Sequence, residues 1–381
     1  MRSLRIYSLL NNLAGGLTSP FIGFLVASSG IPVYLLSIVS SASTSLPGIA
    51  QIAILRIRSN PRSMVFLGTL AIGLLWILSG FVSYASTLFV GLYLVIQVIS
   101  GIASLGWLLI LENISRGRRG FELARYSFYA SAGSLLATLI TGYIVGRNLS
   151  NMGYFFIATG ILLIVSSLAV LGYRESDSSI GGARPKEESF HRTSKSADLL
   201  SRFCIINSAY MVVMSFAWPL FPLAQVYKFR MSAAEVGILT VIAGMSSLAI
   251  QRPLGILVDI NRKTVMVLGR VLLASFPLGY AFSPNIYYLY AIQIISGFTN
   301  SAGIAYTSYV MDHSIDKRRA LSMFNFLNGI ATIIGSIMGG LLYVVLSSAE
   351  DFVAAIDILM TSIGIIRILM AIPYIFLRDP R

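Results

Sequence analysis

The amino-acid sequence predicts an all-α polytopic membrane protein with twelve transmembrane helices in two six-helix bundles. Three observations support this fold class. The 381 residues are 56% hydrophobic and only 11% charged, whereas soluble domains carry about a quarter charged residues. Apolar runs recur along the whole chain, and each is long enough to cross a hydrocarbon core about 30 Å thick. The runs are continuous rather than alternating, which excludes a transmembrane β-barrel.

Each predicted span is an apolar run bounded by polar or charged residues. The first run continues to about Val26 without a cleavage site, so we expect a retained helix rather than a signal peptide. Short turns near Ser83–Ser86 and Ser283–Asn285 separate neighbouring runs. The approximate limits of the twelve spans are 4–27, 33–55, 64–83, 86–111, 121–146, 151–172, 199–223, 233–257, 264–283, 286–310, 320–346 and 352–376.

The distribution of basic residues supports this number of spans, because cytoplasmic loops are enriched in Lys and Arg. With a cytoplasmic N-terminus, 24 of the 28 Lys and Arg residues fall on the cytoplasmic side, including Arg252 and Arg270. Only Arg147, Lys228 and Arg230 fall outside, and Arg367 lies within the last span. The net charge of +13 is therefore a topology signal and not a nucleic-acid footprint. We expect a multi-pass protein of the plasma membrane with both termini in the cytoplasm.

A polar segment at Tyr173–Leu200 divides the spans into two sets of six. It contains Ser, Gly, Pro and mixed charges, which predicts a flexible linker whose basic residues can contact anionic lipid headgroups. The expected organisation is an N-terminal bundle over 1–172, a cytoplasmic linker over 173–198 and a C-terminal bundle over 199–381.

The two halves repeat one another. LVIQVISG at residues 94–101 matches YAIQIISG at residues 290–297, a shift of 196. Because each half has an even number of spans, both halves have the same orientation, and we expect a pseudo-twofold axis along the membrane normal. The matched pairs are Gln97 with Gln293, Gly101 with Gly297, Gly133 with Gly329 and, at a shift of 201, Gly68 with Gly269.

A charged stretch, RPLGILVDINRKTVMVLGR at Arg252–Arg270, joins spans eight and nine. Gly255, Leu257 and Asp259 match the pattern G-x-L-x-D-R-x-G-R-K, and Lys263 holds one of its basic positions. Arg262 stands where the pattern has glycine. This pattern belongs to the major facilitator superfamily, which the chain also resembles in its six plus six spans and polar central loop.

The resemblance implies a gate at this turn, formed by Gly255, Leu257, Asp259, Arg262 and Lys263. Gly255 would let two helices approach closely. Asp259 would face the start of span five, near Phe121–Arg125, and bias the conformational equilibrium without touching substrate. Arg262 and Lys263 would hold this aspartate or lipid phosphates. The alternative is an ordinary basic loop with one acid.

A second glycine-rich stretch lies in span eleven. GSIMGG, Gly335–Gly340, is similar to the family's antiporter motif but has Ser336 in place of proline and lies in a different span. We therefore expect it to serve close helix packing through small residues.

The resemblance also places spans 1, 4, 7 and 10 around a central cavity. Polar and aromatic side chains at helical spacing on these spans are the predicted lining, although each could instead bond another helix. Amides, hydroxyls and aromatic rings suit a neutral or amphipathic solute. The candidates are Tyr7, Asn11 and Thr18; Gln97, Ser100 and Ser104; Asn207, Tyr210 and Trp218; and Gln293, Asn300 and Thr307.

We predict a secondary active or facilitative transporter of a small organic solute, acting by alternating access as a monomer in membrane lipid. Sparse polar lining favours an exporter of amphipathic compounds, and a nutrient (sugar or metabolite) importer or a lipid flippase are the alternatives. The sequence lacks a P-loop, and its histidines, His191 and His313, lie in or beside loops. We expect no enzyme, cofactor or metal site. Proton or ion coupling stays open, with Asp357 and Arg367 in span twelve as the deepest charges.

Overall fold

The computed structural model describes residues 2–54, 60–114, 119–146, 148–172, 191–314, 316–377 and 379. Within these ranges the chain is helical and contains no β-strand. Each span is one helix or a series of short helices, which we call a pass. Because the number of passes is even, the chain ends on the side where it began.

The N-terminal half contributes six passes. The first is broken by Pro20, which lies in a 3₁₀ turn between two α-helices. The remaining five are single helices, as expected for apolar runs that satisfy their backbone groups internally. The elements are α1 (Arg2–Thr18), η1 (Ser19–Phe21) and α2 (Ile22–Ser28); α3 (Val33–Ile54); α4 (Pro61–Gly80); α5 (Thr87–Ile114); α6 (Arg119–Val145); and η2 (Leu149–Asn151) with α7 (Met152–Leu171).

The C-terminal half contributes the other six passes and is more broken. Its seventh pass ends in a π-helical turn, and its tenth is a series of three short helices. The elements are α8 (His191–Ser215), α9 (Leu220–Leu223) and η4 (Ala224–Lys228); α10 (Ala233–Leu272), with α11 (Ser275–Phe282); α12 (Ile286–Gln293), α13 (Ser296–Ser301) and α14 (Gly303–Asp312); α15 (Lys317–Ser347); and α16 (Phe352–Ala371) with η5 (Ile372–Phe376).

Helix α10 contains two passes joined by a sharp turn. It begins with a capping box in which Ser232 and Glu235 satisfy each other's backbone amides. Asn261 has φ −148° and ψ 78°, which breaks the helix between passes eight and nine. The turn is shorter than predicted, and Arg252 and Arg270 lie outside it, within the predicted limits of spans eight and nine. Both lie in helical segments on either side of Asn261.

The predicted number of spans agrees with this structure. Among the described residues, nine helices are long and apolar enough to cross a membrane, and one of them, Ala233–Phe282, holds passes eight and nine. The shorter apolar helix Ala130–Val145 and the broken stretch α12–α14 supply the other two. The predicted linker falls largely outside the described residues, and α8 begins at His191, before the predicted start at 199.

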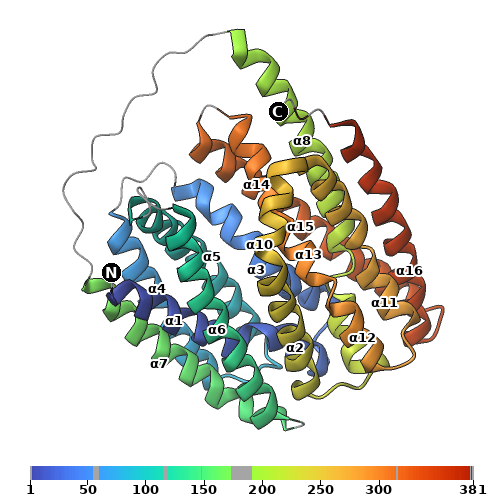
Figure 1. Cartoon of the computed structure of the whole chain (residues 1–381). Helices are drawn as coiled ribbons and strands as arrows, with labels where there is room; N and C mark the ends of the chain where they lie inside the picture. The colour runs from blue at the N-terminus through green and yellow to red at the C-terminus, as the bar shows by residue number, and fades with distance from the viewer. Residues whose placement is uncertain are drawn as a thin grey trace.

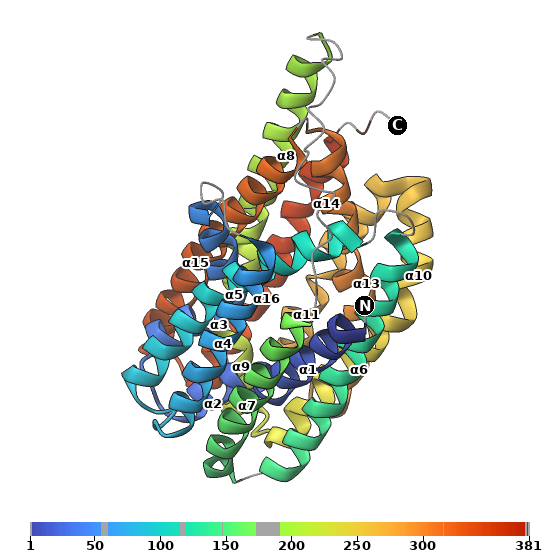
Figure 2. The same cartoon turned by 90° about the vertical axis from the view of Figure 1, so that its left-hand side faces the viewer.

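The passes form two bundles that meet along two seams. In Figure 1 the N-terminal helices, blue to green, lie to the left of the C-terminal helices, yellow to red. Helix α3 packs against α15 in one seam, and α6 packs against α10 in the other; Figure 2 shows the bundles from the side. Buried side chains from both halves form one large apolar cluster that includes Phe21, Phe156 and Leu220.

The internal repeat is visible in equivalent glycine contacts. Gly101 of α5 meets the backbone of Pro47 in α3, and its match Gly297 meets Ser246 in α10. Gly68 meets Ala103, and its match Gly269 meets Ala302. In all four cases neighbouring helices of one bundle approach where a side chain would not fit, which confirms these pairs as structural equivalents.

The third predicted pair is wrong. Gly133 meets Leu9 of α1 within its own bundle, whereas Gly329 meets Ser45 of α3 across the seam. In the C-terminal half, Gly335 makes the contact that corresponds to Gly133. It meets Val212 of α8, the first helix of its own bundle. The shift of 196 therefore does not extend to this helix.

The GSIMGG stretch packs two helices at once. Gly335 faces Val212 of α8 and Gly339 faces Phe216, directly after α8, and a side chain at either glycine would meet the backbone there. Ser336 faces the opposite way, and its hydroxyl donates to the Ser37 carbonyl of α3 at 2.6 Å. The stretch thus joins α15 both to its own bundle and to the other one, which confirms the predicted packing role.

Candidate functional site

A cavity of about 1330 Å³ lies between the two bundles. Helices α1, α3, α4, α5, α6 and α7 form most of its wall, and α10 and α14 form the rest. The volume exceeds the 300–1,000 Å³ typical of small-molecule sites, so a solute of drug size fits with room for water. Among the described residues, no group of His, Cys, Asp and Glu is placed to hold a metal.

The N-terminal wall contains all six candidates predicted from that half. Tyr7, Asn11, Thr18, Gln97, Ser100 and Ser104 line the cavity. The Tyr7 hydroxyl lies 3.2 Å from the Thr69 hydroxyl, and the Tyr7 ring packs at 4.8 Å on Trp107. The Thr18 hydroxyl is buried and has no hydrogen-bond partner among the described residues.

A chain of amides and hydroxyls connects this wall to the other bundle. The Gln51 amide donates to the Ser104 hydroxyl at 3.5 Å, and the Asn325 amide donates to the Gln51 carbonyl at 3.3 Å. Gln51 and Asn325 lie on α3 and α15, which form one of the seams. Neither residue was a sequence candidate, because the family pattern drew attention to passes 1, 4, 7 and 10 only.

The C-terminal wall is a stripe on α10 that carries charge. Arg252, Gly255, Ile256 and Asp259 line the cavity at spacings of three, one and three residues, as expected for one helix face. A side chain at Gly255 would meet nothing within 4 Å. The predicted close helix approach at Gly255 is therefore wrong in this conformation, because the residue faces open space. Leu257 of the same motif does not line the cavity.

Arg262 has different partners from those predicted. It is 2% exposed and forms ion pairs with Asp312 of α14, at 2.6 Å, and with Asp379, near the end of the chain. Its guanidinium also lies 5.2 Å from the Tyr309 ring centroid. The prediction that it holds Asp259 or lipid phosphates is wrong, since the helix turn at Asn261 directs it into its own bundle. Lys263 is only half-buried and does not belong to this cluster.

Asn207 and Tyr210 do not line the cavity. Both are fully buried, and Asn207 accepts hydrogen bonds from Arg270 and from the Tyr374 hydroxyl, the latter at 2.9 Å. The Arg270 guanidinium lies 4.4 Å from the Tyr210 ring centroid and 4.1 Å from that of Tyr306. The prediction failed because this face of α8 turns toward α10 and α16, inside the C-terminal bundle.

The remaining C-terminal candidates also lie outside the lining. These are Trp218, Gln293, Asn300 and Thr307. The Asn300 amide donates to Ser247 at 3.3 Å, and the Thr307 hydroxyl donates to carbonyls of its own helix. Trp218 lies where α8 is interrupted before α9. Breaks in passes seven and ten change which faces meet the cavity, and the regular spacing used for prediction does not include them.

The deep charges of the last pass are both bound within the bundle. The Lys228 ammonium, in the π-helical turn, donates to Asp357 at 2.6 Å and to the carbonyls of Tyr280 and Ala281. Arg367 is 1% exposed and donates to the carbonyl of Leu273 at 2.7 Å and to that of Met214. The predicted position of Arg367 within the last span agrees with this structure, in which backbone carbonyls hold its guanidinium in the core of the bundle.

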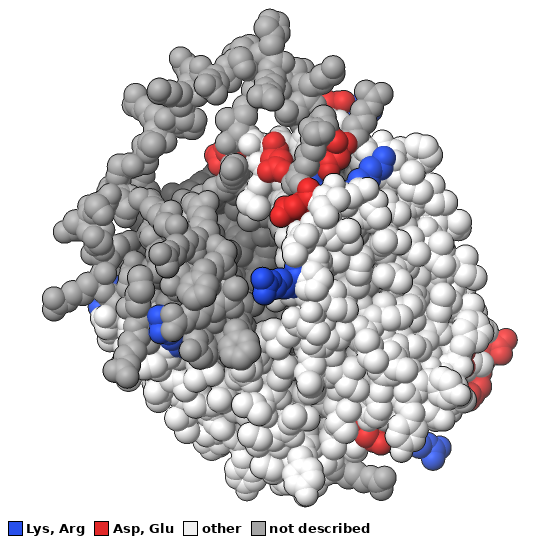
Figure 3. Space-filling model, viewed as in Figure 1, with Lys and Arg blue, Asp and Glu red and all other residues white. Residues whose placement is uncertain are grey.

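The two ends of the cavity differ. At the end where α2 and the π-helical turn lie, Gly142 of α6 packs on α10, and a side chain there would lie 3.1 Å from the Ala233 carbonyl. Gly23 of α2 faces Pro222, and Gly340 faces Ser37. At the opposite end, Tyr7, Leu111 and Asp259 border the cavity. In Figure 3, charged side chains gather at the two ends, with an uncharged belt between them on the C-terminal half.

Comparisons with known proteins identify the same architecture. The family model described as Major Facilitator Superfamily matches residues 203–381. A comparison with curated protein sequences gave no match. Solved structures match over nearly the whole chain, at identities that show the fold alone.

Three of these structures illustrate the likeness. The nucleoside transporter NupG has a TM-score of 0.73 and 13% identity, covering 100% of this chain and 99% of that one. A D-xylose-proton symporter has a TM-score of 0.68 and 15% identity, with 96% of each chain covered. A human organic anion transporter has a TM-score of 0.65 and 13% identity, with 98% of each chain covered.

Proposed function

We propose that the chain is a member of the major facilitator superfamily, whose family model matches residues 203–381, and that it carries a small organic solute across a membrane by alternating access. The observation that supports this most strongly is the cavity between the bundles. It has residues of both halves in its wall, packed helices at one end and a polar border at the other. Repeated bundles that meet around a central site can rock so that each side opens in turn.

The moving units in this proposal are the two bundles, with boundaries at 1–172 and 199–381 around the linker 173–198. A monomer is the expected working unit, because one chain supplies both walls of the cavity. Each seam has close helix contacts through small residues, at Gly48 and Gly329 between α3 and α15 and at Gly142 between α6 and α10. Such contacts let helices tilt against one another without interlocking side chains.

We further propose that the protein lies in the plasma membrane with both termini in the cytoplasm, on the basis of its basic loops. The cavity would then open to the cytoplasm in this structure. We predict export of amphipathic compounds, since aromatic rings of Tyr7, Trp76 and Trp107 line the wall beside few charges. The named neighbours handle nucleosides, D-xylose with protons, and organic anions, which agrees with a small organic solute.

Reconstitution tests this function. Purified protein in liposomes is assayed with labelled nucleosides, sugars, and amphipathic cations and anions, each with and without a pH gradient. We expect at least one class to move faster than in protein-free liposomes, and dependence on the gradient would show proton coupling. The direction of transport would be measured with membrane vesicles of known orientation. If the solute leaves inverted vesicles faster than right-side-out vesicles, the protein moves it toward the cytoplasmic face of the membrane. If no solute moves under any gradient, the transporter proposal is wrong.

The gating role of Asp259 is a separate prediction. Asp259 borders the open end of the cavity and has an interaction partner in the fold. We expect Asp259→Asn to lower the transport rate roughly tenfold, because loss of a charge interaction of about 1.4 kcal/mol shifts a two-state equilibrium by that factor. The shift would be measured as a change in the rate at which a thiol reagent labels Ser104→Cys, with the native cysteine removed by Cys204→Ser. Unchanged transport together with unchanged accessibility would remove Asp259 from the gate.

A further inference from the structure

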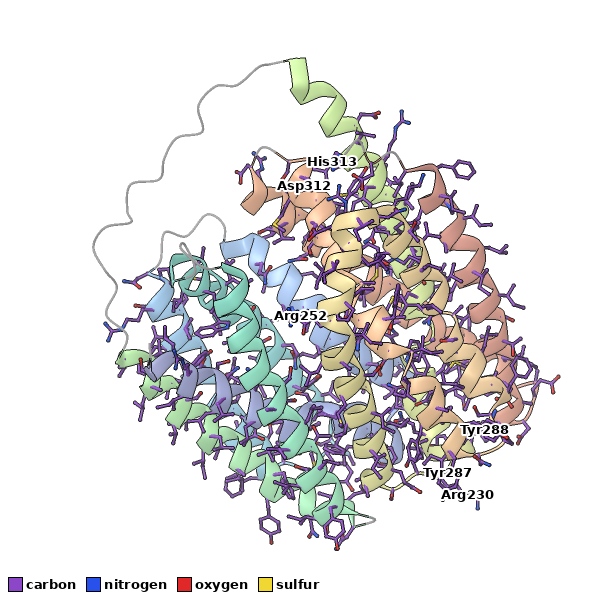
Figure 4. The ribbon with its side chains drawn as sticks, viewed as in Figure 1. Arg230, Arg252, Tyr287, Tyr288, Asp312 and His313 are labelled. Carbon is purple, nitrogen blue, oxygen red and sulfur yellow. The ribbon has the colours of Figure 1, made fainter. Side chains whose placement is uncertain are left out.

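We infer that the solutes are organic anions with an apolar body, and that Arg252 binds their carboxylate group. This rests on the proposed transport function. Arg252 is the only Lys or Arg among the described residues that line the cavity, and its side chain is exposed there. Figure 4 shows it on α10, on the side that faces the N-terminal half.

The positive charge of Arg252 has no fixed counter-ion among the described residues. The ion pairs within the described part of the chain involve other residues, and Arg252 forms no hydrogen bond or ring contact there. Asp259, the only described acid in the lining, lies seven residues away, which is about 10 Å along a helix. Asp259 also interacts elsewhere in the fold. Among the described residues, the cavity therefore presents an arginine whose charge is unmatched.

The other arginines of this bundle show what a structural arginine looks like here. Arg262 lies between two carboxylates, Arg270 packs among tyrosine rings, and Arg367 donates to backbone carbonyls. All three are almost fully buried. Arg252 differs in both respects, since it is exposed and none of the described residues pairs with it. Charged groups at membrane depth are expensive and usually mark a substrate or ion pathway.

A carboxylate is the group that Arg252 is best suited to bind. The guanidinium is planar, stays charged and offers paired N–H donors that match two carboxylate oxygens. The facing wall supplies rings at Tyr7, Trp76 and Trp107 and apolar side chains at Ile72 and Ile96, which suit an aromatic or aliphatic body. The sequence alone suggested a neutral or amphipathic solute, because the predicted lining consisted of amides, hydroxyls and aromatic rings and did not include Arg252.

Matched acid and amide ligands test this inference. Isothermal titration calorimetry on the full-length protein in detergent would compare indole-3-acetate with indole-3-acetamide, and 2-naphthoate with 2-naphthamide. We expect each acid to bind at least tenfold more tightly than its amide. Arg252→Gln should weaken acid binding by about 10–100-fold, the factor for a lost charge-assisted hydrogen bond, and leave amide binding unchanged. Arg252→Lys should give an intermediate loss.

The control is Arg230→Gln, which removes one exposed positive charge outside the cavity lining and should leave acid binding unchanged. The inference is overturned if the wild-type protein binds no acid of the panel, if acids and amides bind equally, or if Arg252→Gln binds acids as the wild type does. Since the acid–amide comparison uses wild-type protein, it holds even if a variant does not fold. The proposed transport function is tested separately. If the wild-type protein and Arg252→Gln both transport neutral solutes but acids bind no better than amides, the anion inference is wrong and the transport proposal stands.

Discussion

Replacing Arg262 by alanine is expected to destabilise the protein by about 3 kcal/mol, the low end of the range for removing one partner from a buried ion pair. The Asp379 side chain is only 12% exposed and would lose its partner, whereas Asp312 is 49% exposed and can be hydrated. Thermal unfolding in detergent, followed by intrinsic fluorescence, would measure the loss as a lower melting temperature.

Arg252→Ala is the matched control for this prediction. It removes the same residue type from the same helix, ten positions earlier, but from an exposed site without a described partner. We expect a change within about 0.5 kcal/mol, as for other exposed substitutions. Asp379→Asn should destabilise more than Asp312→Asn, because it is the more buried acid. Equal melting temperatures for Arg262→Ala and Arg252→Ala would show that the cluster does not stabilise the fold.

Replacing Gly142 by leucine should abolish most transport by separating α6 from α10 at the closed end. A side chain at Gly142 would lie 3.1 Å from the Ala233 carbonyl and 3.3 Å from the Ala234 Cα, and both are backbone atoms that cannot move aside. Overpacking of this kind costs about 1–3 kcal/mol. In the proposed alternating-access cycle this contact forms only when this end is closed, so the change should shift the conformational ratio by about 10–100-fold. Solute flux in liposomes would measure the loss.

Accessibility at the closed end separates this effect from general damage. We expect an impermeant maleimide to label the cysteine of Ala234→Cys slowly in a protein that also has Cys204→Ser. The same cysteine should be labelled faster in the protein that has Gly142→Leu as well. Gly91→Leu is the control, since a side chain there meets no atom within 4 Å. We expect normal flux and normal labelling for the control. Normal flux in Gly142→Leu would mean that the contact does not form the seal.

Much of the fold follows from short-range features of the sequence. A helix in lipid must satisfy its backbone within itself and match the bilayer thickness, so each apolar run predicts its own pass. The ends of α3, of α5 and of α16 together with η5 accordingly lie close to the predicted limits. The repeat pairs Gly68–Gly269 and Gly101–Gly297 are predictable for a related reason, because close helix contacts require small residues in both copies.

The site was predictable in the N-terminal half and much less so in the C-terminal half. Regular helices such as α5 keep their periodicity, so Gln97 and Ser104 face the cavity as expected. Passes that are interrupted do not keep one periodicity along their length. The interruptions after Gln293 come before Asn300 and Thr307 and change the direction of their faces, and sequence spacing contains no signal for the size of that change. Asn207 lies before any break in its pass, on a face of α8 that packs inside the C-terminal bundle.

The sequence by itself determined the number of passes and the repeated architecture, since these depend on local hydropathy and on small residues at helix contacts. Only the tertiary structure decided what each charged residue does. Arg252, Arg262 and Arg270 lie within nineteen residues of one another, yet one lines the cavity, one binds two carboxylates and one packs among tyrosines. The difference arises because each position on a helix faces a different neighbour, and packing across the chain selects that neighbour.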